Sequence, residues 1–268
     1  MNVKLIDILL KKYKHLEIAD ILDHEKFNHI SVVHHSTVLE GATLTAIETQ
    51  VLINEGLTPK GKPLNHSLMV TDHFSALKFI LEDSKKQRPI SVELIQEINS
   101  LVIRNTGSIY NTIFGIIDAT KGQFRKGNVM AGETYFPNYD KVETLTKDLV
   151  DKVTASMQTN LSLIDQVRLS FDAHYSLVSI HPFYDGNGRT SRLLMNYIQA
   201  YYNLPLAIVH KEHKTDYIQA LVNTRTKEDL EIFREFMSNE YIELLKFEIE
   251  KFEELKDDKK NRGFKFLF

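Results

Sequence analysis

The sequence of 268 residues contains no cysteine. This absence excludes disulfide bonds, cysteine-ligated zinc, iron–sulfur clusters, c-type haem and a cysteine nucleophile. Proline and glycine are also scarce, with 6 and 11 residues, which is too few for a turn-rich β-sandwich or β-barrel. The scarcity of turn residues therefore favours a fold built mainly from helices.

The chain also lacks an excess of charge of one sign. Its 33 basic and 36 acidic residues leave a net charge of −3, so no overall basic field exists to hold nucleic acid. No apolar run approaches the roughly 18 residues that span a bilayer, so we expect no membrane insertion. Residues 1–18 are typical of an amphipathic helix rather than a secretory signal, because Asp7 interrupts their apolar stretch. The expected location is the cytoplasm.

Helical periodicity dominates what is present. Apolar residues of Leu161–Ile180 recur at steps of three and four, so they line one face of a helix, and those of Leu230–Leu255 do the same. Segment 124–139 differs, because its glycines and proline surround short apolar and aromatic pieces, which indicates a β-hairpin. The sequence predicts an all-α fold with one small β-hairpin.

Two stretches imitate ligand motifs. Gly56–Lys62 has the spacing of a phosphate-binding loop, but Pro63 replaces the required hydroxyl residue and Pro59 removes a backbone N–H. We interpret it as a connector between helices. The pair His210 and His213 has the spacing of metal ligands on one helical face, but no third ligand is evident from the sequence, so no metal site is predicted there.

The segment His181–Arg192 carries the chemistry. Pro182 forces the preceding helix to end near Ile180, and a new apolar periodicity begins at Leu193, so a short loop leads into a helix N-terminus. Unpaired N–H groups and the helix dipole favour an anion at such a place. The opening of this loop also resembles a calcium loop, but its later positions lack the required glycine and glutamate.

Each polar residue of this loop has a candidate role. Gly186 and Gly188 allow the backbone N–H groups to converge on an anion. Arg189 and Arg192 are three residues apart, so they share a helix face and can clamp phosphate oxygens. Asp185 offers a hard oxygen ligand for magnesium, and the imidazole of His181 offers a base. The loop therefore predicts phosphoryl or nucleotidyl transfer.

The same segment resembles the motif of the Fic family, H-P-F-x-D-G-N-G-R-x-x-R, without a departure. The likeness continues in the helix leading into the motif from Ala173. It extends to Gly122–Arg125 and Val129–Gly132, which resemble the family's flap hairpin, and to the region around Asn203–Pro205 and Tyr217–Leu221. The resemblance implies a Fic-type helical domain with a small β-hairpin flap.

The resemblance implies an ATP- and Mg²⁺-dependent protein adenylyltransferase. His181 would deprotonate a Ser, Thr or Tyr hydroxyl of a target protein, whose oxygen attacks the α-phosphorus of ATP. Asp185 would hold Mg²⁺ across the α- and β-phosphates, and Arg192 would reach the terminal phosphate. The remaining phosphate contacts are assigned to Gly186, Asn187, Gly188 and Arg189. Gly188 favours AMP transfer over phosphorylation, because the kinase-like branch carries lysine there.

Other positions receive supporting roles from the same resemblance. The flap residues Val129, Met130, Ala131 and Gly132 would dock the target by strand addition and cover the nucleotide. Tyr217 and Asn223 are candidates for the adenine side of the pocket. Phe183 is expected to pack into the core and anchor the loop, and His174 to be a packed, hydrogen-bonded histidine that supports it.

An inhibitory motif is expected upstream. Ser36, Glu40 and Gly41 resemble the family's motif S/T-x-x-x-E-G/N, placed on a helix over about residues 31–54. Ser36 and Glu40 are four residues apart, so both would face one side of that helix. The resemblance implies that Glu40 pairs with Arg192 within the chain and blocks productive placement of the γ-phosphate.

We expect an N-terminal helical region over 1–90, a Fic core over 91–240, and a C-terminal helix and tail over 241–268. Two alternatives stay open: a hydrolase that removes AMP with the help of Glu40, and a non-catalytic module that binds nucleotide and a partner. The chain itself is an expected auto-modification substrate, and a homodimer is left open. The Phe-rich end, Phe264–Phe268, is either disordered or a partner contact.

Overall fold

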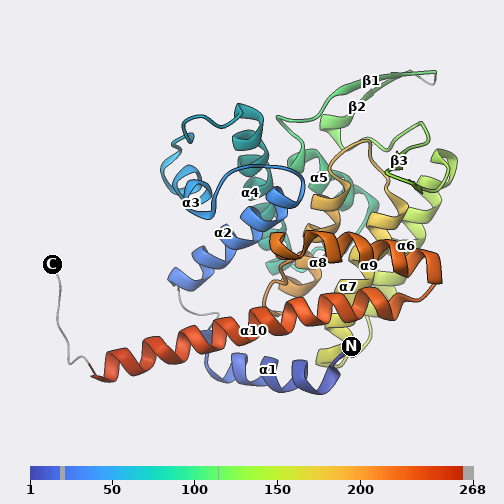
Figure 1. Cartoon of the computed structure of the whole chain (residues 1–268). Helices are drawn as coiled ribbons and strands as arrows, with labels where there is room; N and C mark the ends of the chain where they lie inside the picture. The colour runs from blue at the N-terminus through green and yellow to red at the C-terminus, as the bar shows by residue number, and fades with distance from the viewer. Residues whose placement is uncertain (19–21, 114, 262–268) are drawn as a thin grey trace.

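The computed structural model describes residues 1–18, 22–113 and 115–261 (Figure 1). This part of the chain is mostly helical, as the sequence predicts. The Phe-rich end, Phe264–Phe268, lies outside the described residues. Among the described helices, none has both the length and the apolar character needed to cross a bilayer.

The elements follow one another as helices, with two hairpins between α5 and α6. The α-helices are α1 (Val3–His15), α2 (Leu22–Leu39), α3 (Ala46–Glu55), α4 (Leu64–Lys85), α5 (Val92–Val102), α6 (Val142–Met157), α7 (Leu163–Ile180), α8 (Asn187–Tyr201), α9 (Lys214–Lys227) and α10 (Leu230–Asn261). The 3-10 helices are η2 (Ala119–Lys121), η3 (Tyr139–Lys141) and η4 (Lys211–His213). The strands are β1 (Ile109–Thr112), β2 (Gly115–Asp118), β3 (Met130–Ala131) and β4 (Thr134–Tyr135).

The core centres on α7 and α8, which pack along each other. Helices α2, α4 and α5 contact α8, while α1, α6 and α10 contact α7. The apolar face predicted for α7 is buried, except for Tyr175, which is half-buried. Residues on the other side of the helix, including Ala173 and Leu177, are buried as well. Helix α7 is therefore buried on more than one face, whereas the sequence pattern predicted burial of one face only.

Helix α10 runs along one side of the molecule with α1 against it (Figure 1). Its predicted apolar series is buried at Phe233, Met237, Tyr241 and Leu245. The helix continues through residue 240, where the sequence suggested a boundary. One hydrophobic cluster includes residues from Ile6 to Ile249, so the three predicted regions share a core.

The expectation of a single hairpin is wrong, because the described residues form two. Strands β3 and β4 pair antiparallel inside the predicted segment 124–139. Strands β1 and β2 form the second hairpin, with Ile109 opposite Asp118 and Thr112 opposite Gly115. Its runs are only four residues each, and the sequence between them carries no Asn-Gly or Asp-Gly pair, so the usual hairpin signal is missing.

The predicted inhibitory helix over 31–54 is also corrected. Helix α2 ends at Leu39, and α3 begins after Thr45, whose side chain forms a reciprocal capping box with Glu48. Glu40 and Gly41 form the turn between them, where Gly41 has a φ of 101° that suits glycine. Ser36 therefore lies in the last turn of α2, and Glu40 lies just beyond the helix rather than within it.

Residues 57–63 connect α3 to α4, as the sequence predicts for the imitation of a phosphate-binding loop. Gly56 ends α3 in the left-handed conformation, with a φ of 72°. Helix α4 starts directly after Pro63, so the stretch supplies no strand-to-helix junction of the kind that binds phosphate.

Candidate active site

The loop between α7 and α8 starts at the end of α7. His181 ends α7 in the left-handed conformation, with a φ of 53°, and the following Pro182 keeps the helix from continuing. A non-glycine residue with positive φ is uncommon and points to a constrained position. The aromatic ring of Phe183 is buried, with 1% exposure, and packs against Phe124. The expected anchoring of the loop by Phe183 agrees with this packing.

Asn187 closes the loop on itself. Its Oδ1 accepts a hydrogen bond from the backbone N–H of Phe183 at 3.0 Å, and its Nδ2 donates to the carbonyl of Phe183 at 2.9 Å. The side chain is buried, and both of its polar atoms are used in these bonds. The Asn187 side chain therefore shapes the loop, and the predicted phosphate contact of this residue stays a prediction that its backbone N–H at the helix N-terminus could fulfil.

The N-terminus of α8 has the form of an anion site. Gly186 precedes the helix with a φ of 78°, and no side chain caps the first N–H groups. A Cβ at Gly186 would lie 2.9 Å from the Nδ2 of Asn99, so glycine is required sterically as well. Asn99 in turn donates to the carbonyl of Asp185, which fixes the loop on α5. The uncapped N–H groups are thus held open toward a negatively charged ligand.

Asp185 and Arg189 lie together at the edge of this site. The Asp185 side chain is about half exposed, at 48%, and its Oδ1 lies 3.5 Å from Nη2 of Arg189 and 2.6 Å from the N–H of Gly186. Arg189 is buried and also donates to the carbonyl of Val102. An exposed carboxylate beside an anion site suits Mg²⁺, which takes one or two carboxylates together with substrate phosphates.

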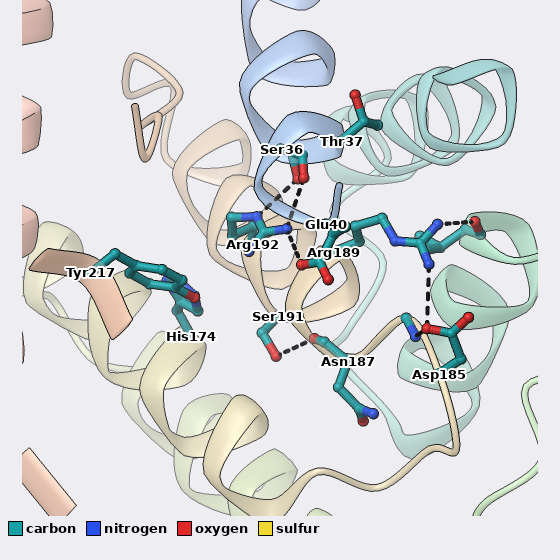
Figure 2. Close-up of polar contacts among 12 residues, drawn as sticks. Ser36, Thr37, Glu40, His174, Asp185, Asn187, Arg189, Ser191, Arg192 and Tyr217 are labelled. Atoms are coloured by element: carbon teal, nitrogen blue, oxygen red, sulfur yellow. Dashed lines mark hydrogen bonds and ion pairs between the residues drawn. The ribbon is translucent and has the colours of Figure 1, made fainter. Parts of the chain in front are cut away.

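Arg192 points the other way, toward the N-terminal region (Figure 2). Its Nη2 donates to Oε1 of Glu40 at 2.7 Å and to the carbonyl of Ser36 at 3.0 Å, while its Nε donates to Oγ of Ser36 at 2.8 Å. Ser36 and Glu40 thus engage Arg192 while Arg189 contacts Asp185, and the clamp of both arginines on phosphate stays a prediction. The contact between Glu40 and Arg192 that the resemblance implied is present.

The charge of Glu40 is set by its surroundings. Burial alone would raise the pKa of the Glu40 carboxyl, but the guanidinium groups of Arg192 and Arg189 outweigh it and lower the pKa below its ordinary value. Glu40 is therefore a carboxylate at neutral pH. It approaches α8 so closely that a Cβ at Gly188 would lie 2.4 Å from its Oε1. A larger residue at position 188 would therefore force this carboxylate to shift.

His181 is placed as a neutral imidazole. Burial lowers its pKa to about 4, so the ring is unprotonated near neutral pH. The ring stacks on Phe136, with centroids 3.8 Å apart and an angle of 18° between the planes. Its Nδ1 lies 3.4 Å from the carbonyl of Val178, which favours the proton on Nδ1 and leaves Nε2 free to accept one.

These groups meet in one cavity of about 270 Å³. His181, Gly188, Arg192 and Glu40 contribute its polar side, and Ile218, Leu221 and Val222 of α9 contribute an apolar side. The cavity is thus lined by a base, by a helix N-terminus and by an arginine that is paired with a carboxylate. Such an arrangement can bind a polyanion and accept a proton beside it.

Residues 89–199 match the sequence model of the Fic/DOC family. These residues are similar to a Fic domain. Similar curated proteins include protein adenylyltransferase Fic of Culex quinquefasciatus, 28% identical over 198 residues, which are 74% of this chain and 37% of that protein. Protein adenylyltransferase fic-1 of Caenorhabditis briggsae is 26% identical over 224 residues, 82% of this chain and 41% of that protein. The chain thus spans about two fifths of the length of these relatives.

Solved structures show the same fold. A Fic domain containing signaling protein from Bacteroides thetaiotaomicron superposes with a TM-score of 0.79 at 24% identity, over 93% of this chain and 97% of that one. Fic-1 from C. elegans gives a TM-score of 0.73 at 23% identity, over 93% of this chain and 72% of that one. The predicted helical fold with a small hairpin flap is confirmed.

Fewer of the predicted flap residues line the cavity than expected. Of the four flap residues assigned from the sequence, Val129, Met130, Ala131 and Gly132, only Ala131 lines the cavity. Thr134 and Phe136 line it instead, from the second half of the hairpin. The side chain of Met130 is 54% exposed on strand β3, and Gly132 makes the turn with a φ of 56°.

The sequence did not identify two arginines of the site, Arg125 and Arg225. Arg125 is buried and donates to the carbonyls of His181, Gly127 and Pro137, so it ties the flap to the loop. Arg225 lines the cavity and lies over the ring of Phe136, with 5.3 Å from its Cζ to the ring centroid. Lone arginines in a sequence give no signal of such roles, because their partners are backbone groups and one ring from distant segments.

The two candidates for the adenine side of the pocket, Tyr217 and Asn223, differ in their position relative to the cavity. Tyr217 lines the cavity, and its hydroxyl bonds Nε2 of buried His174 at 2.9 Å. His174 is packed and hydrogen-bonded as expected, but it supports α9 through Tyr217 rather than the loop. The prediction for Asn223 is corrected, because this residue lies on another side of α9 and does not line the cavity. Its Oδ1 accepts a hydrogen bond from Gln219 instead.

Proposed function

We propose that this protein transfers AMP from ATP to a Ser, Thr or Tyr hydroxyl of a target protein, and that Glu40 holds it in an inhibited state. The observation that carries the proposal is the cavity in which neutral His181 faces the uncapped N-terminus of α8 beside Arg192. The names of the relatives support the same reaction.

His181 supplies the base of the reaction. A pKa of about 4 keeps the imidazole unprotonated, so Nε2 can accept the hydroxyl proton over the whole physiological range. The hydroxyl oxygen then forms a bond to the α-phosphorus, and the bond from that phosphorus to the bridging oxygen of pyrophosphate breaks. Phe136 and Arg125 hold the ring and the backbone of His181 in place for this transfer.

The triphosphate site is formed by the start of α8. The N–H groups after Gly186 would bind phosphate oxygens, and Asp185 would hold Mg²⁺. When bound, the metal neutralises phosphate charge and favours departure of pyrophosphate. Arg189 keeps the carboxylate of Asp185 in position from below, since its own side chain is buried. The apolar residues of α9 would border the adenine, together with Tyr217.

Inhibition follows from the hydrogen bonds that Ser36 and Glu40 make with Arg192. Its Nε and Nη2 make three hydrogen bonds to Ser36 and Glu40, so these donors are not available to a γ-phosphate in this arrangement. A carboxylate at that place also repels the phosphate by its charge. ATP bound under these conditions would have its α-phosphorus out of line with the attacking hydroxyl, and a misplacement of about 1 Å costs roughly 10²-fold in rate.

The target would dock on the flap. Among the strands that the structure describes, β3 pairs only with β4, and the exposed side chains of Met130 and Tyr135 lie at this hairpin. An extended target segment can add to such an edge by backbone hydrogen bonds and place its hydroxyl near His181. The cytoplasmic location and a homodimer stay predictions.

The test uses the Glu40→Gly protein with α-labelled ATP, Mg²⁺ and cell lysate. Label should appear on target proteins and on the protein itself, and γ-labelled ATP should leave none. The matched control is Glu55→Gly, at an exposed glutamate near the end of α3. The double variant Glu40→Gly/His181→Ala should lose the label. Label from γ-labelled ATP, or none from either nucleotide, would contradict AMP transfer.

Removal of AMP is a second candidate function. The carboxylate of Glu40 lines the same cavity as His181 and keeps 31% of its side-chain surface accessible there. As a deprotonated group it can orient a water molecule toward a phosphodiester. In that case the wild-type protein releases AMP from a pre-labelled target, and Glu40→Gly does not.

A further inference from the structure

A cluster of histidine and glutamate side chains lies between η4 and α10, apart from the cavity. It consists of His210 and His213, around η4, with Glu240 and Glu243 one turn apart on α10. One ligand atom from each residue lies within 4.8 Å of the others. The sequence showed the two histidines but no third ligand, because the glutamates follow about 30 residues later on another element.

The buried carboxylate of Glu240 is the centre of this cluster. Its side chain is 3% exposed, with Oε2 lying 3.0 Å from Nδ1 of His210 and Oε1 lying 2.5 Å from Nδ1 of His213. Within the described part of the chain, its ion-pair partners are these two histidines, and neither lysine nor arginine is among them. A buried carboxylate needs a compensating positive charge, which a cation bound between these side chains would supply.

We propose that His210, His213, Glu240 and Glu243 form a structural Zn²⁺ site. Two neutral imidazoles and two carboxylates balance the charge of the ion. Imidazole ligands favour Zn²⁺ over Mg²⁺ or Ca²⁺, and four side-chain ligands without an open position are typical of structural zinc. Zinc replaces the protons on the two Nδ1 atoms, so each neutral ring carries its proton on Nε2.

The geometry needs only small movements. Ligand atoms on a tetrahedral zinc ion with bonds of 2.0–2.1 Å are about 3.3 Å apart. The contacts of Glu240 with His210 and His213, at 3.0 and 2.5 Å, must open by less than 1 Å to admit the ion. Glu243 is exposed, so its side chain can rotate toward the other three ligands without disturbing the core.

The site would fasten the turn between α8 and α9 to α10. The backbone N–H of His210 already donates to Glu240, and the N–H of Lys211 donates to Nδ1 of His35 on α2. The rings of His35 and His210 are 5.0 Å apart in an edge-to-face contact. Zinc would therefore stabilise the surface on which α2, the helix that carries Ser36, rests.

Isothermal titration of tag-free, chelator-treated protein with zinc chloride tests this site. We expect binding of one ion per chain, with a rise in melting temperature. Glu243→Gln and His213→Gln should each weaken zinc affinity by at least about tenfold, the loss typical even of outer-sphere partners. Glu250→Gln, at an exposed glutamate further along α10, is the matched control and should bind as the wild type does.

Asp185→Ala should also leave zinc binding unchanged, which separates this site from the one proposed for Mg²⁺. Glu243→Gln keeps the buried contacts of Glu240, so its circular dichroism should match the wild type and a lost affinity reports a lost ligand. Equal affinity and stoichiometry in wild type, Glu243→Gln and His213→Gln would overturn the proposal. An absence of zinc binding to the wild type would also overturn it, and would leave a cluster held by hydrogen bonds alone.

Discussion

The hydroxyl of Ser36 is expected to hold part of the inhibition, and Ser36→Ala removes it selectively. Oγ of Ser36 accepts from Nε of Arg192 at 2.8 Å in a buried setting. The variant leaves the bonds of Arg192 to the Ser36 carbonyl and to Glu40 in place. We expect this hydrogen bond in the inhibited form only, because Arg192 would no longer contact Ser36 when it turns toward the γ-phosphate.

The size of the effect follows from one hydrogen bond to a charged group. Such a bond contributes about 1.5–3 kcal/mol. If this energy is lost only from the inhibited form, the equilibrium shifts by about 10- to 150-fold toward the active form. The rate of auto-modification with α-labelled ATP should rise by up to that factor. It should stay below the rate of Glu40→Gly, which removes both the pairing and the blocking carboxylate.

Thr37→Val is the matched control. The hydroxyl of Thr37 is buried one residue further on, but it donates to the carbonyl of Val33 within its own helix and does not contact Arg192. Its removal should leave auto-modification at the wild-type level. If Ser36→Ala stays at that level too while Glu40→Gly is active, then the hydroxyl does not contribute and the reasoning from the buried hydrogen bond fails.

Four further predictions concern catalysis and stability. His181→Ala in the Glu40→Gly background should slow AMP transfer by about 10²–10⁴-fold, with ATP affinity by calorimetry nearly unchanged, since the imidazole acts on the hydroxyl. Asp185→Ala should alter the Mg²⁺ dependence of transfer, and an unchanged titration curve would remove this residue from the metal site. Arg192→Ala should not activate the protein, and Arg192→Ala/Glu40→Gly should resemble it, because the γ-phosphate ligand is lost in both; an active double variant would refute this. Burial lowers the pKa of His35 and His181 to about 4 from 6.5, so between these values the unfolded chain binds more protons than the folded one; the free energy of unfolding in urea should therefore fall from pH 7 to pH 5, and a rise would contradict it.

The sequence by itself determined the features that depend on neighbouring residues. The end of α7 at Ile180 follows from Pro182, and the start of α8 follows from Gly186 and the apolar residues after it. The contiguous motif His181–Arg192 was enough to indicate nucleotidyl transfer, because its base, metal ligand and anion site lie within one loop. The inhibitory pairing came from the resemblance rather than from spacing.

Only the tertiary structure decided which partner each side chain takes. Arg192 meets Ser36 from 156 residues away, and Arg125 meets three carbonyls that no sequence pattern marks. The side chain of Asn187 braces its own loop, because a buried amide satisfies both of its polar atoms with the nearest backbone. Local sequence patterns specify backbone conformation. The hydrogen-bond partners of long side chains depend instead on which groups the packing of distant helices brings within about 3 Å, so they are determined only in the folded chain.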